Sequence, residues 1–387
     1  MKASRLTLED IAAPENLRRA FLRAARGKAH RAEVLAYRAN LDWRLGELRQ
    51  EILAGEPRVG QFQRFRIFEP KERIIHAPVF SERVLHHALV GPAEADFERW
   101  SIHDNYACRR GKGREAALRR AEQHARRWPW FLKLDVRKYF DSIPHDTLGG
   151  MIRPRWRDRR VGELWTKIIG VYCTQPGRGL PIGALTSQFL ANYYLRTVDL
   201  AMAEAAGVHG YVRYMDDMAL WAEDKTALLR AKSTVDMVLT AQSLEIKPSW
   251  HLRRTRFGMD FLGYRVFPTG STLARPSRRR FLRRWGWLER ARESATISER
   301  VAQSRVVALV EFVRVARRET ILQRLFGQNE GTGHRAPTGL TGAAAGTTRL
   351  PTVGRPTGTT TRRATATTTS GSGWPSAQPG AAEPSSD

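Results

Sequence analysis

The sequence predicts an α+β fold, because three stretches of the chain differ in their apolar pattern. Apolar residues recur at helical spacing among arginines over residues 6–53. Short apolar runs separated by polar turns follow up to about residue 267, as in strands and hairpins that alternate with helices. Residues 273–326 return to helical spacing and are very basic. We therefore expect helical segments on either side of a mixed centre of strands and helices.

The centre carries acidic residues at the ends of two predicted strands. A hairpin over residues 211–221 places Asp216 and Asp217 side by side at its tip. Asp135, 81 residues before Asp216, directly follows the apolar run 131–134. Such an acid is costly unless it is solvated, paired or bound to a metal. A solvated or helix-capping Asp135 is the alternative, but carboxylate oxygens suit Mg²⁺ or Mn²⁺, and the pair favours a shared metal site.

A glycine-rich loop lies between these two acidic strands. Residues 179–188 contain a Gly-Leu-Pro-Ile-Gly turn, and a helix is predicted from Phe189 to Ala203. Backbone amides at the opening of such a helix can approach an anion or a base pair closely. The loop alone is weak support, since many helices begin this way. Three carboxylates with two cations, in this order along the chain, suit an in-line attack on phosphorus.

In this order of motifs the chain resembles the reverse transcriptases, and specifically those of diversity-generating retroelements within the group II intron-like bacterial family. The similarity runs from about residue 65 to residue 265. Its motifs are 73–78 and 106–113 of the fingers, 131–144 (motif A), 179–195 (motif B), 211–221 (motif C) and the primer-gripping hairpin 257–265. The resemblance implies a right-hand polymerase fold with fingers, a palm built on an antiparallel sheet, and a helical thumb.

The resemblance also implies roles for individual residues. Asp135, Asp216 and Asp217 are the expected catalytic and metal-binding acids, with the Val136 carbonyl helping to hold one of two Mg²⁺ ions, or Mn²⁺ in their place. Asp217 is further expected to support the primer end, and Phe140 to exclude a 2′ hydroxyl. The expected nucleotide contacts are Arg73, Arg83, Phe140, Ile182, Gly183 and Gln188. The expected primer grip is Phe261, Leu262, Gly263 and Tyr264.

Motif B departs from most of the family at two positions. Ile182 stands where others have glutamine, and Gln188 stands where others have proline. This variant resembles the retroelements that mutate a target gene through errors at template adenines. Isoleucine cannot hydrogen-bond to the nucleotide, and the loss of about 1 kcal/mol would weaken discrimination several-fold. Neutral drift with ordinary fidelity is the alternative.

The composition agrees with a nucleic-acid partner. The chain has 65 Lys plus Arg against 39 Asp plus Glu, a formal charge of +26. Such a surface attracts polyanions with an affinity that falls as salt rises. Cys108 and Cys173 are too few for a disulfide framework and lack zinc-like spacing. No apolar run approaches the length of a membrane span, so we expect a soluble, cytoplasmic protein without a membrane partner.

Four regions follow from these patterns. Residues 1–61 form a helical segment that joins the fingers, 62–267 form fingers and palm, and 268–328 form a basic helical thumb. A solvated pair of charged helices is the alternative for the thumb. Residues 329–387 are rich in Thr, Gly, Ala, Pro and Ser and carry too few large apolar residues for a core, which predicts a disordered tail. Read-through or a shifted reading frame could also produce this change.

The expected activity is RNA-directed DNA synthesis. The partners would be an RNA template, a DNA or RNA primer and deoxynucleoside triphosphates. The resemblance adds a small basic accessory protein and a structured template RNA. A defence-type reverse transcriptase and a catalytically silent RNA-binding module are the rival classes. Three acids in a basic protein argue against the second, since a binding module has no use for a metal-ready cluster.

Overall fold

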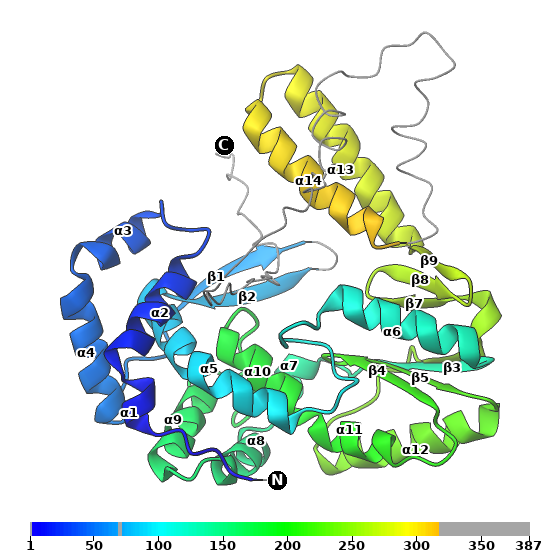
Figure 1. Ribbon diagram of the computed structural model, residues 1–387, viewed down its shortest axis with the longest axis horizontal. Coiled ribbons are helices and arrows are strands. Elements are labelled where there is room, and N and C mark those ends of the chain that lie inside the picture. Colours follow the sequence, from blue (N-terminus) through cyan, green and yellow to red (C-terminus); the bar gives the residue numbers. More distant parts are fainter. Residues whose placement is uncertain (1, 69–71, 317–387) are drawn as a thin grey trace, which may run out of the picture.

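The computed structural model describes residues 2–68 and 72–316 (Figure 1). Its N-terminal part is a group of helices packed on a long fifth helix. The Thr7 side chain and Asp10 form a capping box at the first of these, and Pro14 opens the second. The helices are α1 (Leu8–Ile11), α2 (Pro14–Ala25), α3 (Ala32–Ala39), α4 (Leu41–Leu53) and α5 (Phe80–Trp100). The helical segment expected over residues 6–53 is confirmed.

A two-stranded antiparallel hairpin separates α4 from α5. Strand β1 (Phe62–Ile67) pairs with β2 (Arg73–Pro78), and Phe65 lies opposite Ile75. Most residues of both strands are at least partly exposed, because the hairpin projects beside the helices rather than into a core (Figure 1). Strand β2 leads directly into α5, which packs on α2 and on the later helix α10 (Leu185–Tyr194).

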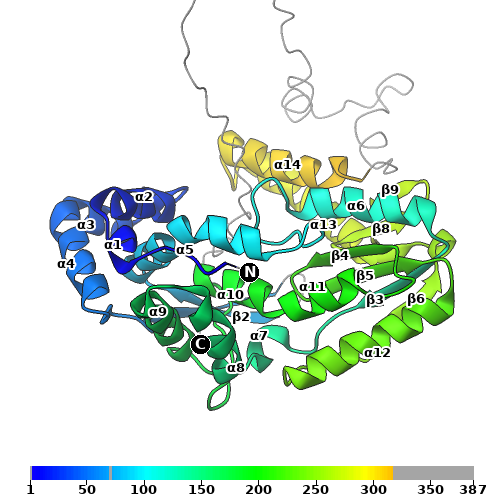
Figure 2. The ribbon, with the colours of Figure 1, turned by 60° about the horizontal axis from the view of Figure 1, so that its bottom comes forward.

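The central sheet has four antiparallel strands in the order β4-β5-β3-β6. Its residues alternate between two cores, as the pleat requires. Phe131 and Trp221 lie opposite each other and face one core, whereas Leu132 and Leu220 face the other. Figure 2 shows the sheet between α6 and α12. The elements are α6 (Arg114–Arg127), β3 (Trp130–Leu134), β4 (Gly210–Tyr214), β5 (Asp217–Ala222), α12 (Lys225–Ala241) and β6 (His251–Arg254).

The connection from β3 to β4 is helical. Its elements are α7 (Tyr139–Ser142), α8 (His145–Ile152), a 3₁₀ turn (Arg153–Arg155), α9 (Arg159–Gly170), α10 (Leu185–Tyr194) and α11 (Arg196–Ala203). The expected single helix from Phe189 to Ala203 is therefore wrong, since it begins at Leu185 and is interrupted at Leu195. The carbonyl of Tyr194 accepts a hydrogen bond from the Gln242 side chain at 3.0 Å, which satisfies it where the helix breaks.

A second, three-stranded antiparallel sheet precedes the last two helices. It contains β7 (Met259–Phe261), β8 (Tyr264–Phe267) and β9 (Gly270–Leu273), after a 3₁₀ turn at Thr255–Phe257. Helices α13 (Arg275–Glu293) and α14 (Glu299–Arg314) then pack on each other through an apolar stripe that includes Phe281, Trp285 and Val310. Figure 1 shows this pair standing beyond the sheets.

These elements confirm the α+β class. The helical pattern expected over residues 273–326 appears as α13 and α14, and Ser298 precedes the first turn of α14. The part of this pattern beyond residue 316, the end of the thumb at residue 328 and the tail 329–387 lie outside the described residues. Over residues 2–68 and 72–316, none of the helices combines the length and apolar character needed to cross a bilayer.

Candidate functional site

The predicted acids meet at one edge of the central sheet. Strand β3 ends at Leu134, which pairs with Met218 of β5, and the β4–β5 turn lies just beyond that pair. The register therefore brings Asp135 beside the turn that carries Asp216. The two carboxyl groups share a side-chain hydrogen bond. The sequence-based expectation that these acids adjoin is confirmed.

The environment of Asp216 strongly disfavours its charged form. Burial and the neighbouring Asp135 carboxylate together raise the pKa of Asp216 to about 7. Two carboxylates at hydrogen-bonding distance resist simultaneous ionisation unless a positive charge offsets them. The pair is therefore a place where a bound cation would be stabilising.

The turn between β4 and β5 is held in an unusual conformation. Met215 has a positive φ of 57°, which is uncommon for a residue with a side chain. Its carbonyl oxygen accepts a hydrogen bond from Arg213 Nη1 at 3.0 Å. Arg213 is fully buried and forms a bidentate pair with Asp199, with Nε–Oδ1 and Nη2–Oδ2 distances of 2.6 and 2.5 Å. A buried, fully bonded guanidinium thus fixes the backbone on which Asp216 sits.

Lysines accompany the two other acids. Lys133 Nζ forms an ion pair with Asp217, and Lys247 Nζ lies 3.4 Å from Asp135 Oδ2. Burial raises the pKa of Asp217, and Lys133 opposes that shift. Lys247 reaches the site because Ile246 bridges to Val136 beyond the end of β3. Asp217 thus has a lysine of its own, whereas the two carboxylates of the pair Asp135–Asp216 share the single lysine Lys247.

The Asp135–Asp216 pair fits a divalent cation that substrate helps to bind. Mg²⁺ is commonly held by one or two carboxylates together with substrate phosphates, rather than by a complete protein cage. Within the described ranges, no group of three or more His, Cys, Asp or Glu side chains forms such a cage. Two adjoining carboxylates with excess negative charge match a Mg²⁺ site that the substrate phosphates complete.

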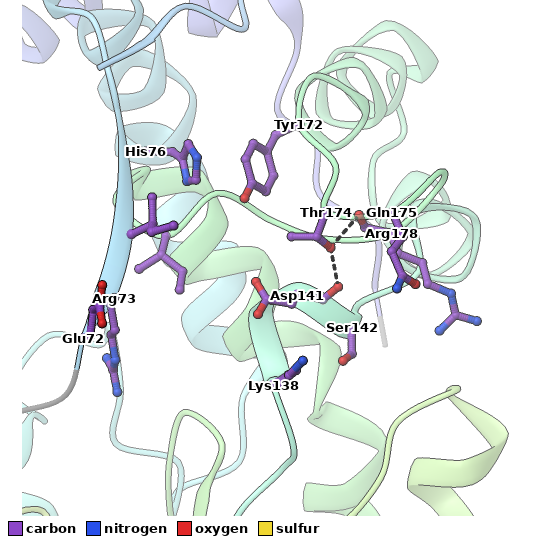
Figure 3. A pocket seen from close by; sticks show the side chains of 12 residues that line it. Glu72, Arg73, His76, Lys138, Asp141, Ser142, Tyr172, Thr174, Gln175 and Arg178 are labelled. Carbon is purple, nitrogen blue, oxygen red and sulfur yellow. Dashed lines mark hydrogen bonds between the residues drawn. The ribbon is translucent and has the colours of Figure 1, made fainter. Parts of the chain in front are cut away.

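A pocket of about 540 Å³ opens between β2, the α7 turn and the loop before α10 (Figure 3). Of the predicted nucleotide contacts, Arg73 and Ile182 line it. The Asp141 carboxylate points into it, and the rings of His76 and Tyr172 adjoin at 4.7 Å. The other lining residues are Glu72, Ile74, Lys138, Ser142, Thr174, Gln175 and Arg178. Cations, aromatic rings and a carboxylate together suit a charged, partly planar ligand.

Gly183 lets the loop before α10 lie directly against β2. The backbone N–H of His76 donates to the Ile182 carbonyl at 2.8 Å. A Cβ on Gly183 would come within 2.8 Å of Ile75 Cγ2, and its φ of 124° disfavours any side chain. Gly183 thus brings this backbone close to a strand of the protein, and the approach to an anion or a base pair expected of the loop stays a prediction.

Of the six predicted nucleotide contacts, four do not line this pocket: Gly183, which adjoins Ile182, and the three residues that follow. Arg83 is on α5 and pairs with Glu33 at 2.7 Å. The Gln188 Oε1 atom lies 3.7 Å from the Sγ of Cys108. Phe140 packs edge-on against Tyr139, with ring centroids 5.7 Å apart. None of the three lines the pocket, and their roles stay predictions.

The predicted primer-grip segment forms the β7–β8 hairpin. Its turn residues Leu262 and Gly263 have positive φ values of 52° and 89°, as in the tight turns that join antiparallel strands. Phe261 and Tyr264 are buried, and the Tyr264 hydroxyl donates to the Phe312 carbonyl of α14 at 2.8 Å. The hairpin is confirmed, and contact with a primer stays a prediction.

Sequence reasoning missed Lys133, Lys247 and the pocket-lining loop 172–178. Lys133 was detectable, because it precedes Asp135 by two residues and shares its face of the strand. Lys247 and the loop give no local signal, since long-range pairing positions them.

Comparison with known proteins decides the family. The family model for reverse transcriptase (RNA-dependent DNA polymerase) matches residues 71–266, half of the chain. The chain belongs to this reverse transcriptase family. Its fold is accordingly the expected right-hand polymerase fold.

Individual relatives match over shorter stretches. The group II intron-encoded protein LtrA of Lactococcus lactis subsp. cremoris is 25% identical over 135 residues, 33% of this chain and 22% of that protein. The retron Ec86 reverse transcriptase of Escherichia coli is 27% identical over 119 residues, 30% of this chain and 36% of that one. An uncharacterized 91 kDa protein in the cob intron of Schizosaccharomyces pombe is 30% identical over 112 residues, 27% and 14% of the respective chains.

The chain thus spans between 14% and 36% of the lengths of these curated relatives. Among solved structures, apo telomerase from Candida tropicalis, truncated from the C-terminal domain, gives a TM-score of 0.42. Its sequence identity is 12%, with 56% of this chain and 55% of that chain covered.

Proposed function

We propose that this chain is an RNA-directed DNA polymerase that extends a primer 3′ hydroxyl with deoxynucleotides on an RNA template. The observation that carries the proposal is the meeting of Asp135 and Asp216 at the sheet edge, within a chain of the reverse transcriptase family. Their excess negative charge suits cation-assisted phosphoryl transfer. The formal charge of +26 suits a polyanionic template and primer.

Each residue has a proposed part in this reaction. Asp135 and Asp216 would hold Mg²⁺ or Mn²⁺, with the Val136 carbonyl as a further ligand, and bound cations would neutralise charge at the reacting phosphate. Arg73 would contact the triphosphate from the pocket wall. Phe140 would exclude a ribose 2′ hydroxyl. Asp217 would support the primer end, beside the β7–β8 hairpin.

Primer extension tests the activity. The purified chain is incubated with an RNA template, an annealed primer, dNTPs and either Mg²⁺ or Mn²⁺. Extension that needs a divalent cation and follows the template sequence is expected. Tight RNA binding without extension under either cation would instead favour the RNA-binding module.

We further propose that the enzyme is error-prone at template adenines and serves a diversity-generating retroelement by mutagenic retrohoming. The support is that Ile182, an aliphatic residue, forms part of the pocket wall where a hydrogen-bonding side chain would constrain the nucleotide.

Ile182→Gln should lower misincorporation opposite adenine several-fold. Ile74→Gln, at the same pocket but on β2, is the matched control. Equal error spectra for wild type and Ile182→Gln would show that Ile182 is not the cause of errors at template adenines.

A structured template RNA and a small basic accessory protein are the proposed partners. Within the described residues, we assign the grip on nucleic acid to the hairpins and to the helix pair α13–α14. The isolated chain should therefore show short extension products on arbitrary RNA and longer ones with both partners. Full-length, adenine-mutagenic copying of arbitrary RNA by the chain alone would contradict this dependence.

A further inference from the structure

Lys133 occupies an unexpected place for a lysine. It lies inside strand β3, between its neighbours β5 and β6, and its side chain is 13% exposed. A buried ammonium group is costly unless it is paired. Its Nζ forms the ion pair with Asp217 and also lies 5.9 Å from the centre of the Phe261 ring. Lys133 therefore contacts both the catalytic hairpin and the β7–β8 hairpin.

Asp217 is held from two directions. Lys133 approaches it from the central sheet, and the backbone amide of Leu262 gives it a hydrogen bond from the β7–β8 turn. The side chain of Asp217 thus joins the two sheets at the point where the β4–β5 hairpin and the β7–β8 hairpin adjoin.

The β7–β8 turn is in turn fixed to the last two helices. The backbone N–H of Ala274, just before α13, donates to the Gly263 carbonyl at 3.0 Å. The Tyr264 hydroxyl donates to the Phe312 carbonyl of α14. A Cβ on Gly263 would lie 3.1 Å from Ser277 Oγ, so the turn is closely packed there. Continuous contacts therefore run from Asp217 to α13 and α14.

We propose that Lys133 is a positioning residue for the primer end. Its ammonium group holds the Asp217 carboxylate against the β7–β8 turn, and this fixes the spacing between the catalytic hairpin and the primer-gripping hairpin. The inference rests on the proposed function. It also assigns Asp217 to this junction rather than to a metal, and leaves Asp135 and Asp216 as the metal-binding acids.

Steady-state kinetics test the proposal. Lys133→Met keeps the apolar stem but removes the charge, so the KM for primer–template should rise about tenfold while the KM for dNTP changes less than about twofold. Lys133→Arg keeps the charge, and its KM for primer–template should stay close to the wild-type value. Lys232→Met, which removes a lysine 5.2 Å from the Trp250 ring but no acid contact, should behave as wild type.

Hydrogen exchange measures the junction without any catalysis. In Lys133→Met, the amides of residues 259–264 should exchange faster, whereas those of β6 should keep wild-type rates. If the methionine variant does not fold, Lys133→Gln, which keeps a donor but no charge, provides both measurements.

The outcomes separate the two proposals. If the wild-type chain never extends a primer, the proposed function is refuted. If the amides of residues 259–264 exchange at wild-type rates in Lys133→Met, the proposed junction is refuted, whether or not the chain is active. An active wild type with an unchanged primer KM in Lys133→Met also overturns the positioning role. Equal rises in the KM for primer–template and the KM for dNTP would also overturn the positioning role, because they would indicate a general disturbance of the active site.

Discussion

Arg213 donates a hydrogen bond to the carbonyl of Met215, the residue directly before Asp216. The same guanidinium pairs with Asp199 and with the Asn192 side chain and carbonyl at 2.9 and 3.0 Å. All five N–H donors of Arg213 therefore have acceptors, which a flexible point charge such as lysine could not reproduce. The backbone of the β4–β5 turn therefore depends on a buried ion pair beneath it.

Removal of one member of this pair should be strongly destabilising. Arg213→Met leaves Asp199 buried without its cationic partner, with the Tyr211 hydroxyl as a remaining donor, and should lower the free energy of unfolding by about 3–5 kcal/mol. The double variant Arg213→Met/Asp199→Leu should lose less, because no unpaired charge remains. Urea denaturation of both variants provides the measurement. A single variant that loses under about 1 kcal/mol would show that the pair is not essential to the fold.

Asp216→Asn should abolish DNA synthesis and leave RNA affinity nearly intact. The substitution removes one of two adjoining carboxylates, and with it the charge that would hold a cation, while the basic surface is unchanged. Primer extension and a filter-binding assay measure the two properties. Mn²⁺ should raise the melting temperature of the wild type more than that of the variant. The control is Asp236→Asn, an exposed acid of α12; wild-type extension by Asp216→Asn would refute the metal assignment.

Phe140→Ala should admit ribonucleotides. The carbonyl of Phe140 accepts a hydrogen bond from the Leu180 backbone at 2.8 Å, which fixes the short helix α7 against the loop before α10. A ring held in this way can reject a 2′ hydroxyl by steric overlap. The ratio of dNTP to NTP incorporation should fall by an order of magnitude or more, equivalent to at least about 1.4 kcal/mol. Trp43→Ala removes an exposed ring of α4 and should leave the ratio unchanged.

The local patterns of the sequence were sufficient for the acidic pair and the hairpins. Asp135 and Asp216 each follow an apolar strand. Both strands, β3 and β4, pair antiparallel with β5, so their carboxyl ends lie at the same edge of the sheet. The break at Leu195 was not predictable in this way, because it depends on the Gln242 side chain from the end of α12. Lys247 likewise approaches Asp135 through the bridge between flanking segments. Contacts of this kind arise from the tertiary fold, and no periodicity in the sequence encodes them.

His124 should make the protein acid-sensitive. Burial, with a smaller contribution from nearby Arg120, lowers the pKa of His124 from its ordinary value of 6.5 to about 4. The unfolded chain therefore binds a proton that the folded chain rejects, and stability present above pH 6.5 is lost as the pH falls toward 4. Between pH 7 and 5 the loss from this residue should be about 2 kcal/mol.

Urea denaturation of wild type and His124→Gln at both pH values isolates this effect. The variant should lose about 2 kcal/mol less than wild type over the interval, since its side chain does not titrate. His30→Gln, at an exposed position, is the control. The stacking of His124 on Trp221, with ring centroids 5.2 Å apart, will be lost at every pH and so cancels in the difference. Parallel pH profiles for His124→Gln and wild type would contradict the prediction.

Gly183→Ala should damage both stability and nucleotide binding. The new Cβ would lie 2.8 Å from Ile75 Cγ2 and 3.1 Å from the His76 carbonyl, on a backbone with a φ of 124°. Strain and overpacking should together lower the free energy of unfolding by about 1–3 kcal/mol. Displacement of β2 from Ile182 would also open the pocket wall and raise the KM for dNTP. The matched control is Gly46→Ala, in the middle of α4 with no atom within 4 Å, which should instead gain about 0.5–1 kcal/mol. A stable Gly183→Ala enzyme with a wild-type KM would mean that β2 and this loop do not need their close approach.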